Sequence, residues 1–304
     1  MNRRQFVAAA AATPFALRSV LAAAARAPAA LVTCDAQSRL AVVDLGSFHV
    51  VRSIATLPDP RSIELVGGRA VVCHTDVGAV SIVDGRRVLH VLRDFEQPRY
   101  TAAHPDGVPA FVTDSGRSGV VAIDVVRGKV LGRVALPGWA RHLTIDRGGT
   151  RLWIGLGSAS TEVAVVDTSR LRHVSTIEPG YPSHDVGLAP DGRLWVTSGS
   201  ERKLTAAGSV RPADAAPQHV TFGPRAAYVT SGDSGTLHVQ SLVDGRVLRS
   251  SRIPTGSYNV QHGWGHVLTP SLSHGTLAVL SESGALLATV AVADSCHDAC
   301  FRPV

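Results

Sequence analysis

Short runs of apolar residues, bounded by glycine, proline, aspartate and serine, fill the chain from about residue 29 onward. Alternation of apolar and polar positions predicts β-strands, and no stretch shows the 3.6-residue period of an amphipathic helix. The runs recur with starts near residues 31, 71, 111, 153, 195, 228 and 267. A repeat of about 40 residues with four short strands is typical of the blades of a β-propeller.

Seven starts predict an all-β, seven-bladed β-propeller with four-stranded blades over residues 28–304. The repeat begins on a second strand, at 30–34, and ends on a first strand, at 296–303. The C-terminal strand is therefore expected to complete the N-terminal blade, which closes the ring and removes an exposed sheet edge. The fifth repeat is short, so its outer strand near 209–211 is expected to be stunted.

Three segments resemble the repeats of a known family: YVTSG (228–232), WVTSG (195–199) and LAPDGRLW (188–195). They are similar to the YVTN-repeat propellers, including the YncE-like exported proteins, and the resemblance covers about residues 29–304. It implies the propeller architecture and export. The resemblance says little about the activity of the protein, because propellers host many unrelated functions.

Residues 1–27 read as an export signal with a basic start and an alanine-rich apolar run. Arg3-Arg4 followed by Phe6 resembles the twin-arginine type, although Asn2 stands where Ser or Thr is usual. An uncleaved amphipathic helix is the alternative. The expectation is an exported protein, periplasmic or extracellular, with no membrane span after signal removal.

Composition fits a folded domain, since 45% of the 304 residues are hydrophobic and 18% are charged. The net charge of +6 is spread along the chain, without a block of five like charges. A basic nucleic-acid arm is therefore not supported.

Inner strands of a propeller line its central channel, so the residues at their entries can meet. Placed in register, these entries read Ser62, Tyr100, His142, His184, His219, Asn259 and His297. The four histidines, with Asp185 and Asp298 directly after two of them, form a candidate transition-metal site for Cu, Fe or Zn. The alternative is that histidines here only bond neighbouring backbone.

Arg61, Arg99 and Arg141 precede three consecutive entries and are expected to form an electropositive arc over the mouth of the channel. With Tyr100 and Asn259 they make a candidate site for a small anionic ligand. Single-stranded nucleic acid is a less favoured partner. The alternative is that these are ordinary exposed arginines of an arginine-rich chain.

Cys34 and Cys296 are expected to lie opposite each other, within two residues, where the closing strands pair. Directly opposed residues are within reach of a disulfide, and an exported protein has the redox setting for it. Two alternatives stay open: Cys300 as the partner of Cys34, or Cys34, Cys73 and Cys296 as reduced metal ligands.

The preferred function is an exported propeller, expected to be monomeric, that binds a ligand, metal or protein partner at the mouth of its channel. The alternative is a metal- or cofactor-dependent enzyme, redox or hydrolytic, that uses the channel histidines. Gly232-Asp233-Ser234-Gly235 resembles a protease nucleophile motif, but its phase in the repeat predicts a turn.

Overall fold

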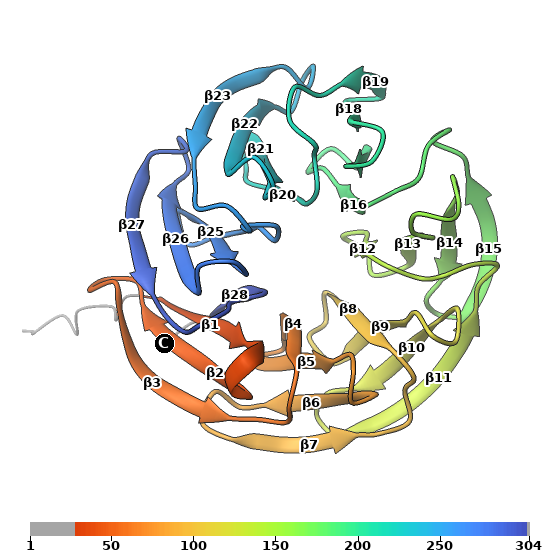
Figure 1. Cartoon of the computed structure of the whole chain (residues 1–304). Coiled ribbons are helices and arrows are strands. Elements are labelled where there is room, and N and C mark those ends of the chain that lie inside the picture. The colour runs from red at the N-terminus through yellow and green to blue at the C-terminus, as the bar shows by residue number, and fades with distance from the viewer. Residues whose placement is uncertain (1–27, 303–304) are drawn as a thin grey trace, which may run out of the picture.

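The computed structural model describes residues 28–302, and the predicted signal at 1–27 lies outside them. Seven four-stranded antiparallel sheets stand around a central channel, as Figure 1 shows. The predicted all-β, seven-bladed propeller is thereby confirmed. Between residues 28 and 302, no helix is long and apolar enough to cross a membrane.

We number the blades in chain order and give the strands of each from the channel outward. Blade 1 comprises β28 (Ala299–Arg302), β1 (Ala29–Cys34), β2 (Arg39–Asp44) and β3 (His49–Ala55), with a 3-10 helix η1 (Asp35–Gln37) after β1. Blade 2 comprises β4 (Pro60–Val66), β5 (Arg69–His74), β6 (Ala79–Val83) and β7 (Val88–Leu92). Blade 3 comprises β8 (Pro98–Ala103), β9 (Pro109–Asp114), β10 (Gly119–Asp124) and β11 (Lys129–Ala135).

The other four blades repeat this order. Blade 4 comprises β12 (Leu143–Ile145), β13 (Arg151–Gly155), β14 (Val163–Asp167) and β15 (Arg172–Ile177). Blade 5 comprises β16 (Asp185–Leu188), β17 (Leu194–Ser198), β18 (Lys203–Ala206) and β19 (Ser209–Pro212). Blade 6 comprises β20 (Val220–Phe222), β21 (Ala226–Ser231), β22 (Thr236–Ser241) and β23 (Val247–Arg252). Blade 7 comprises β24 (Gln261–Gly263), β25 (His266–Ser271), β26 (Thr276–Ser281) and β27 (Leu286–Ala291).

The two ends of the chain meet in blade 1, where β28 pairs with β1 (Figure 1). The register sets Leu31 opposite Cys300 and Val32 opposite Ala299. Beyond β28 the contact continues as backbone hydrogen bonds between Thr33 and Asp298 (2.9 Å) and between His297 and Thr33 (3.3 Å). The predicted closure by the C-terminal strand is confirmed, with a strand shorter than the expected 296–303.

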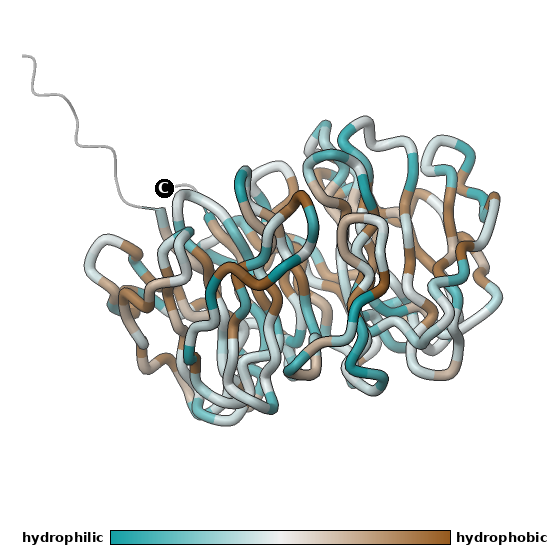
Figure 2. The backbone as a smooth tube through the Cα atoms, turned by 90° about the horizontal axis from the view of Figure 1, so that it is seen from above, coloured by the Kyte–Doolittle hydropathy of each residue, from teal (hydrophilic) through white to brown (hydrophobic). Residues whose placement is uncertain are grey.

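The core lies between neighbouring blades, and Figure 2 shows hydrophobic segments running through the middle of the ring. Strands such as β6 and β10 are buried at every position. Both faces of a middle strand pack against other blades, so it reads as a continuous apolar run, as in a sheet covered on both sides. Clear alternation between buried and exposed residues is therefore not general in these strands.

Aspartates shape the turns between third and fourth strands. In blade 1, Asp44 Oδ1 accepts hydrogen bonds from the backbone N–H groups of Gly46 (3.1 Å) and Ser47 (2.7 Å). Asp124 and Asp167 occupy the same place in blades 3 and 4. Hydrogen bonds from Ser169 and Arg170 lower the pKa of Asp167 to about 2. Short polar side chains that bond backbone two or three residues ahead favour such turns.

Candidate functional site

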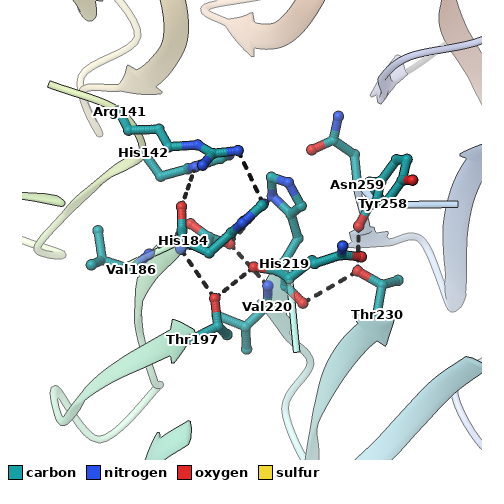
Figure 3. Close-up of polar contacts among 12 residues, drawn as sticks. Arg141, His142, His184, Val186, Thr197, His219, Val220, Thr230, Tyr258 and Asn259 are labelled. Carbon is teal, nitrogen blue, oxygen red and sulfur yellow. Dashed lines mark hydrogen bonds and ion pairs between the residues drawn. The ribbon is translucent and has the colours of Figure 1, made fainter. Parts of the chain in front are cut away.

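The entries to the inner strands carry side chains that bond the next blade, as Figure 3 shows for His142. His142 Nδ1 donates to the backbone oxygen of His184 at 2.7 Å, and Asn259 Nδ2 donates to that of His297 at 2.8 Å. Ser62 makes the same kind of bond to the backbone oxygen of Arg99. These positions therefore join neighbouring blades, which agrees with the alternative that the histidines bond neighbouring backbone.

Three of the four predicted histidines meet in the channel. His142, His184 and His219 precede the inner strands of blades 4, 5 and 6. The ring centroid of His219 lies 4.2 Å from that of His142 and 5.1 Å from that of His184. His297, on blade 1, instead receives a hydrogen bond from Asn259 at 3.3 Å and makes no ring contact within the described part of the chain.

His142 holds a nitrogen that no residue between 28 and 302 uses. Its Nδ1 carries the proton, because its partner is a backbone carbonyl. Nε2 must then hold the lone pair, and it is buried with no hydrogen-bond partner among residues 28–302. A tautomer fixed in this way by a carbonyl is the usual arrangement of a metal-binding histidine.

Asp185 completes a three-residue group with His142 and His219. One ligand atom from each of the three lies within 4.8 Å of the others, and all three residues are buried. Asp185 Oδ2 lies 3.5 Å from His219 Nδ1 and also accepts the backbone N–H of Val220 at 2.9 Å. This group, which we call the channel triad, is the candidate metal site.

Thr197 positions Asp185 from β17. Its hydroxyl donates to the backbone oxygen of Gln218 and accepts the backbone N–H of Asp185 at 3.0 Å. Sequence reasoning did not assign Thr197 a role. Its signal was visible, since threonine recurs at this place of the repeat, as in Thr33, Thr113 and Thr230.

His184 lies beside the channel triad without belonging to it. Arg141 Nη2 donates to His184 Nε2 at 3.2 Å, which occupies the lone pair that a metal would need (Figure 3). His184 contributes its backbone oxygen to His142 instead. Its side chain therefore links the triad to the arginines at the mouth.

Asp298 repeats the geometry of Asp185 without a metal group. Its carboxylate accepts the backbone N–H of Ala299 at 2.8 Å and that of Ile63, on the next blade, at 3.1 Å. Blade 2 has Ser62 at the entry where blade 6 has His219. The second predicted aspartate thus joins blades 1 and 2 at the ring closure.

The two imidazoles of the triad are neutral near pH 7. Burial, and then the nearby Arg141, lower the pKa of His219 well below its usual value. The pKa of His142 is lowered by burial, His219 and Arg141 in that order, and that of His184 by the same causes. Burial raises the pKa of Asp185 to about 7. Neutral imidazoles keep the lone pairs that a metal ion requires.

A cavity of about 190 Å³ occupies the channel below the histidines. His142, Asp185 and His219 border it together with Tyr100 and Glu64. The ring centroid of Tyr100 lies 3.4 Å from that of His142, and burial raises the pKa of Tyr100 to about 12. Tyr100 therefore stays neutral and forms part of the wall. Asn259 also borders the cavity, but its amide is engaged with His297.

The three predicted arginines are also brought together. Arg61 and Arg99 start β4 and β8, and Arg141 precedes β12, so they lie on three consecutive blades. All three are half-buried. Arg99 and Arg141 both lie near the Trp139 ring, with their Cζ atoms 4.6 and 5.9 Å from its centroid. We call Arg61, Arg99 and Arg141 the arginine arc.

Cys34 and Cys296 are neighbours at the closure. Both are fully buried in one hydrophobic cluster, and interaction with the other thiol lowers the pKa of Cys34 and raises that of Cys296. Continuing the β1–β28 register sets Cys34 opposite His297, one residue from Cys296. Both are free thiols in the structure, and the disulfide stays a prediction.

The two alternatives for the cysteines do not fit the geometry. Cys300 packs between blades 1 and 2, whereas Cys34 packs between blades 1 and 7, on the other face of the sheet. Cys73 lies between blades 2 and 3, with Sγ 3.7 Å from Thr101 Oγ1. Within residues 28–302, no cysteine joins the group that can hold a metal.

The predicted turn at 232–235 lies between β21 and β22. Asp233 accepts hydrogen bonds from Tyr258 (2.9 Å) and Gln218 (3.2 Å). The hydroxyl of Ser234 bonds the backbone of Ser231 at 3.2 Å. This segment is part of the turn, with no histidine among these partners.

No protein-family model and no curated protein matches the sequence. Solved structures with a similar fold include hydrazine synthase of Kuenenia stuttgartiensis, with a TM-score of 0.72, 17% identity, and 89% of this chain and 100% of that chain covered. A functionally unknown protein from Desulfotomaculum acetoxidans has a TM-score of 0.74 and 12% identity, with coverage of 90% and 98%. Streptogramin B lyase has a TM-score of 0.65 and 13% identity, with coverage of 77% and 83%.

Dihydro-heme d1 dehydrogenase NirN is also similar, with a TM-score of 0.64, 11% identity, and coverage of 88% of this chain and 73% of that one. Identities this low show a shared fold and no shared chemistry. The YVTN-repeat and YncE-like assignment therefore stays a prediction. By its blades and its neighbours, the chain is a seven-bladed β-propeller.

Proposed function

We propose that this protein is an exported propeller that binds a divalent transition metal in its central channel through His142, Asp185 and His219. The observation that carries the proposal is the buried, unpartnered Nε2 of His142, a residue that has ligand atoms of Asp185 and His219 within 4.8 Å of one of its own. A buried polar atom without a partner is costly, and a metal ion would satisfy it. Export and a monomeric state are part of the proposal, from the sequence.

The donor set indicates which metals fit. Two imidazoles and one carboxylate suit zinc, iron or copper better than calcium or magnesium, which prefer oxygen ligands. Asp185 is held by the backbone N–H groups of Val186 (2.7 Å) and Val220 (2.9 Å), and His142 by the carbonyl of His184. Such surrounding bonds fix the direction of metal ligands.

The test is titration of the metal-free, exported protein with Zn²⁺, followed by calorimetry and by elemental analysis after gel filtration. We expect one equivalent to bind. His142→Ala and His219→Ala should each weaken binding at least about a hundredfold, since even outer residues of metal sites are worth 10- to 100-fold. Asp185→Asn preserves the shape of the side chain and removes its charge, so it tests the third ligand in a folded protein.

Two matched histidine variants serve as controls. His297→Ala changes the same place of the repeat on blade 1, outside the triad, and His49→Ala changes an exposed histidine of β3. Both should retain wild-type affinity. Co²⁺ loaded into the wild-type protein should give absorption bands from nitrogen and oxygen ligands, a readout independent of any variant. Failure of the wild type to bind, or equal binding by all variants, would refute the proposal.

A second candidate is metal-dependent catalysis. The specific observation in its favour is that the triad supplies only three protein ligands, whereas catalytic metal sites keep positions open for water or substrate. Cu²⁺-loaded protein should then accelerate the relaxation of bulk water protons through an exchanging bound water. A closed, slowly exchanging site would instead favour the binding role.

A further inference from the structure

The arginine arc is built into the rigid part of the ring. The backbone oxygen of Arg61 accepts a hydrogen bond from Thr33 Oγ1 at 3.1 Å, and that of Arg99 accepts one from the Ser62 hydroxyl. The backbone N–H of Arg141 donates to the oxygen of Gly155 at 2.9 Å. Bonds between blades, for Arg61 and Arg99, and within blade 4, for Arg141, thus fix the backbone of the three residues around one side of the mouth.

The three positive charges of the arc have carboxylates near them but no salt bridge within residues 28–302. Asp59, Asp76 and Asp185 act on the three guanidinium groups only at longer range. Among residues 28–302, no carboxylate lies within 4.0 Å of these guanidinium groups, and the Nε atoms of Arg99 and Arg141 are buried without a partner. Burial first, and then repulsion from Arg61 and Arg141, lower the pKa of Arg99. The arrangement is unfavourable unless something negative binds.

Several exposed arginines of the same chain pair with carboxylates, which the arginines of the arc do not within the described part of the chain. Arg117 and Arg133 both contact Asp94, at 3.0 and 2.7 Å. Arg127 contacts Asp124 at 2.8 Å. Arg61, Arg99 and Arg141 are half-buried at the mouth of the channel and have no such carboxylate within 4.0 Å among residues 28–302.

Trp139 keeps two of the guanidinium groups in place. Arg99 Cζ lies 4.6 Å and Arg141 Cζ 5.9 Å from its ring centroid, within the range of cation–π attraction. Arg141 also donates to His184, whose carbonyl fixes His142. The arc is therefore preorganised, and it lies next to the channel triad.

We propose that Arg61, Arg99 and Arg141 form a binding site for a small, multiply charged oxyanion, either a polycarboxylate or a phosphate. Guanidinium groups bind both through paired, charge-assisted hydrogen bonds. Only one part of this inference rests on the proposed function: that the bound anion directs an oxygen to an open position of a metal in the triad. The arginine site itself does not require the metal.

The experiment is calorimetry of the chelator-treated, metal-free protein at low ionic strength, with citrate and with inorganic phosphate as probes. We expect saturable binding of at least one of them. Arg99→Gln, Arg61→Gln and Arg141→Gln should each weaken it by about tenfold or more, as expected for charge-assisted bonds. Added sodium chloride should weaken binding by screening. Preference for citrate identifies a polycarboxylate site, and preference for phosphate a compact anion site.

The matched control is Arg86→Gln, which removes the same charge at an exposed position between β6 and β7. It should change affinity less than about twofold, because the net-charge effect of one exposed residue is small. Arg99→Gln and Arg141→Gln also remove contacts with Trp139, and Arg141→Gln one with His184, so the unfolding temperature of each variant without anion is measured to show that it is folded.

Three results would overturn the inference: no binding of either probe, wild-type affinity in Arg99→Gln, or an equal loss in Arg86→Gln. Repeating the titration with Zn²⁺-loaded protein separates the two proposals. Tighter binding with metal supports an anion that reaches the triad. Binding by the arc in a protein that takes up no metal would refute the metal site and leave the oxyanion site standing.

Discussion

His142 donates from Nδ1 to the backbone oxygen of His184 across the boundary between blades 4 and 5, at 2.7 Å. This bond gives one residue two properties. It joins two blades, which is the structural use of the position, and it leaves Nε2 with a lone pair buried in the channel. The structural and metal-binding readings of the histidines are therefore compatible at His142.

The first prediction concerns His184, which acts through its backbone. His184→Ala keeps the carbonyl that fixes His142, so metal affinity should stay within about tenfold of wild type, whereas removal of a direct ligand costs more. Competition with a chromophoric zinc chelator measures this. Complete loss of metal in His184→Ala, with a native circular dichroism spectrum, would place His184 among the ligands.

The second prediction concerns the charge of Arg141 beside the triad. Its guanidinium lies 3.2 Å from His184 Nε2 and disfavours positive charge on the nearby histidines. Arg141→Gln should therefore tighten binding of Zn²⁺ by about three- to tenfold in the absence of anions, by removing Coulomb repulsion. The same variant should bind citrate or phosphate more weakly. Arg86→Gln should alter neither affinity.

The third prediction uses two threonines at the same place of the repeat. Thr197 bonds both Gln218 and Asp185, whereas Thr269 Oγ1 is buried with no partner in the described part of the chain. Thr197→Val should lower the free energy of unfolding by about 1–3 kcal/mol, because it leaves buried partners unsatisfied. Thr269→Val should be neutral or stabilising. Urea unfolding measures both, and equal effects would contradict the assignment.

The fourth prediction concerns pH and Glu64, which borders the channel cavity. Burial raises the pKa of Glu64 to about 7 from an ordinary value of 4.5. Between these values the unfolded chain loses the proton more readily than the folded one. Ionisation therefore destabilises the fold increasingly from about pH 4.5 to pH 7, and the penalty is constant above.

Glu64→Gln removes this penalty. The variant and the wild type should be equally stable near pH 4, and the variant should be more stable by up to about 3 kcal/mol at pH 8. Chemical unfolding across this range gives the difference. Burial and then the charge of Glu64 raise the pKa of Asp298, so Glu64→Gln also relieves Asp298 and adds to the stabilisation at high pH. A difference independent of pH would argue against a raised pKa.

The fifth prediction concerns the closure. Mild oxidation should link Cys34 to Cys296, which are buried in the same hydrophobic cluster and shift each other's pKa. The bond would close a loop of most of the chain, and the chain-entropy model gives a gain of up to about 5 kcal/mol. Peptide mapping after alkylation identifies the link. It should persist in Cys300→Ser and disappear in Cys296→Ser, and a link through Cys300 or Cys73 would contradict the structure.

The sequence by itself determined the architecture. Repeat starts such as Trp195-Val196-Thr197 and Tyr228-Val229-Thr230 mark the second strand of a blade, and they predicted seven blades and closure at Cys34 and Cys296. A local pattern suffices here, because each blade is made from consecutive residues and repeats the same alternation and turns. Alignment of the repeats in register also identified the column of residues at the entries to the inner strands, from Ser62 to His297.

The tertiary structure decided which members of that column can act together. The four histidines of the inner-strand entries are equivalent in register, but hydrogen bonds between blades make them different. The bond to His184 leaves the Nε2 lone pair of His142 free. On His184, Arg141 occupies the Nε2 lone pair. Asp185 meets His219, whereas Asp298 accepts the backbone N–H of Ile63 and joins blades 1 and 2. These differences depend on which side chain the next blade presents, and such contacts between distant residues leave no local pattern in the sequence.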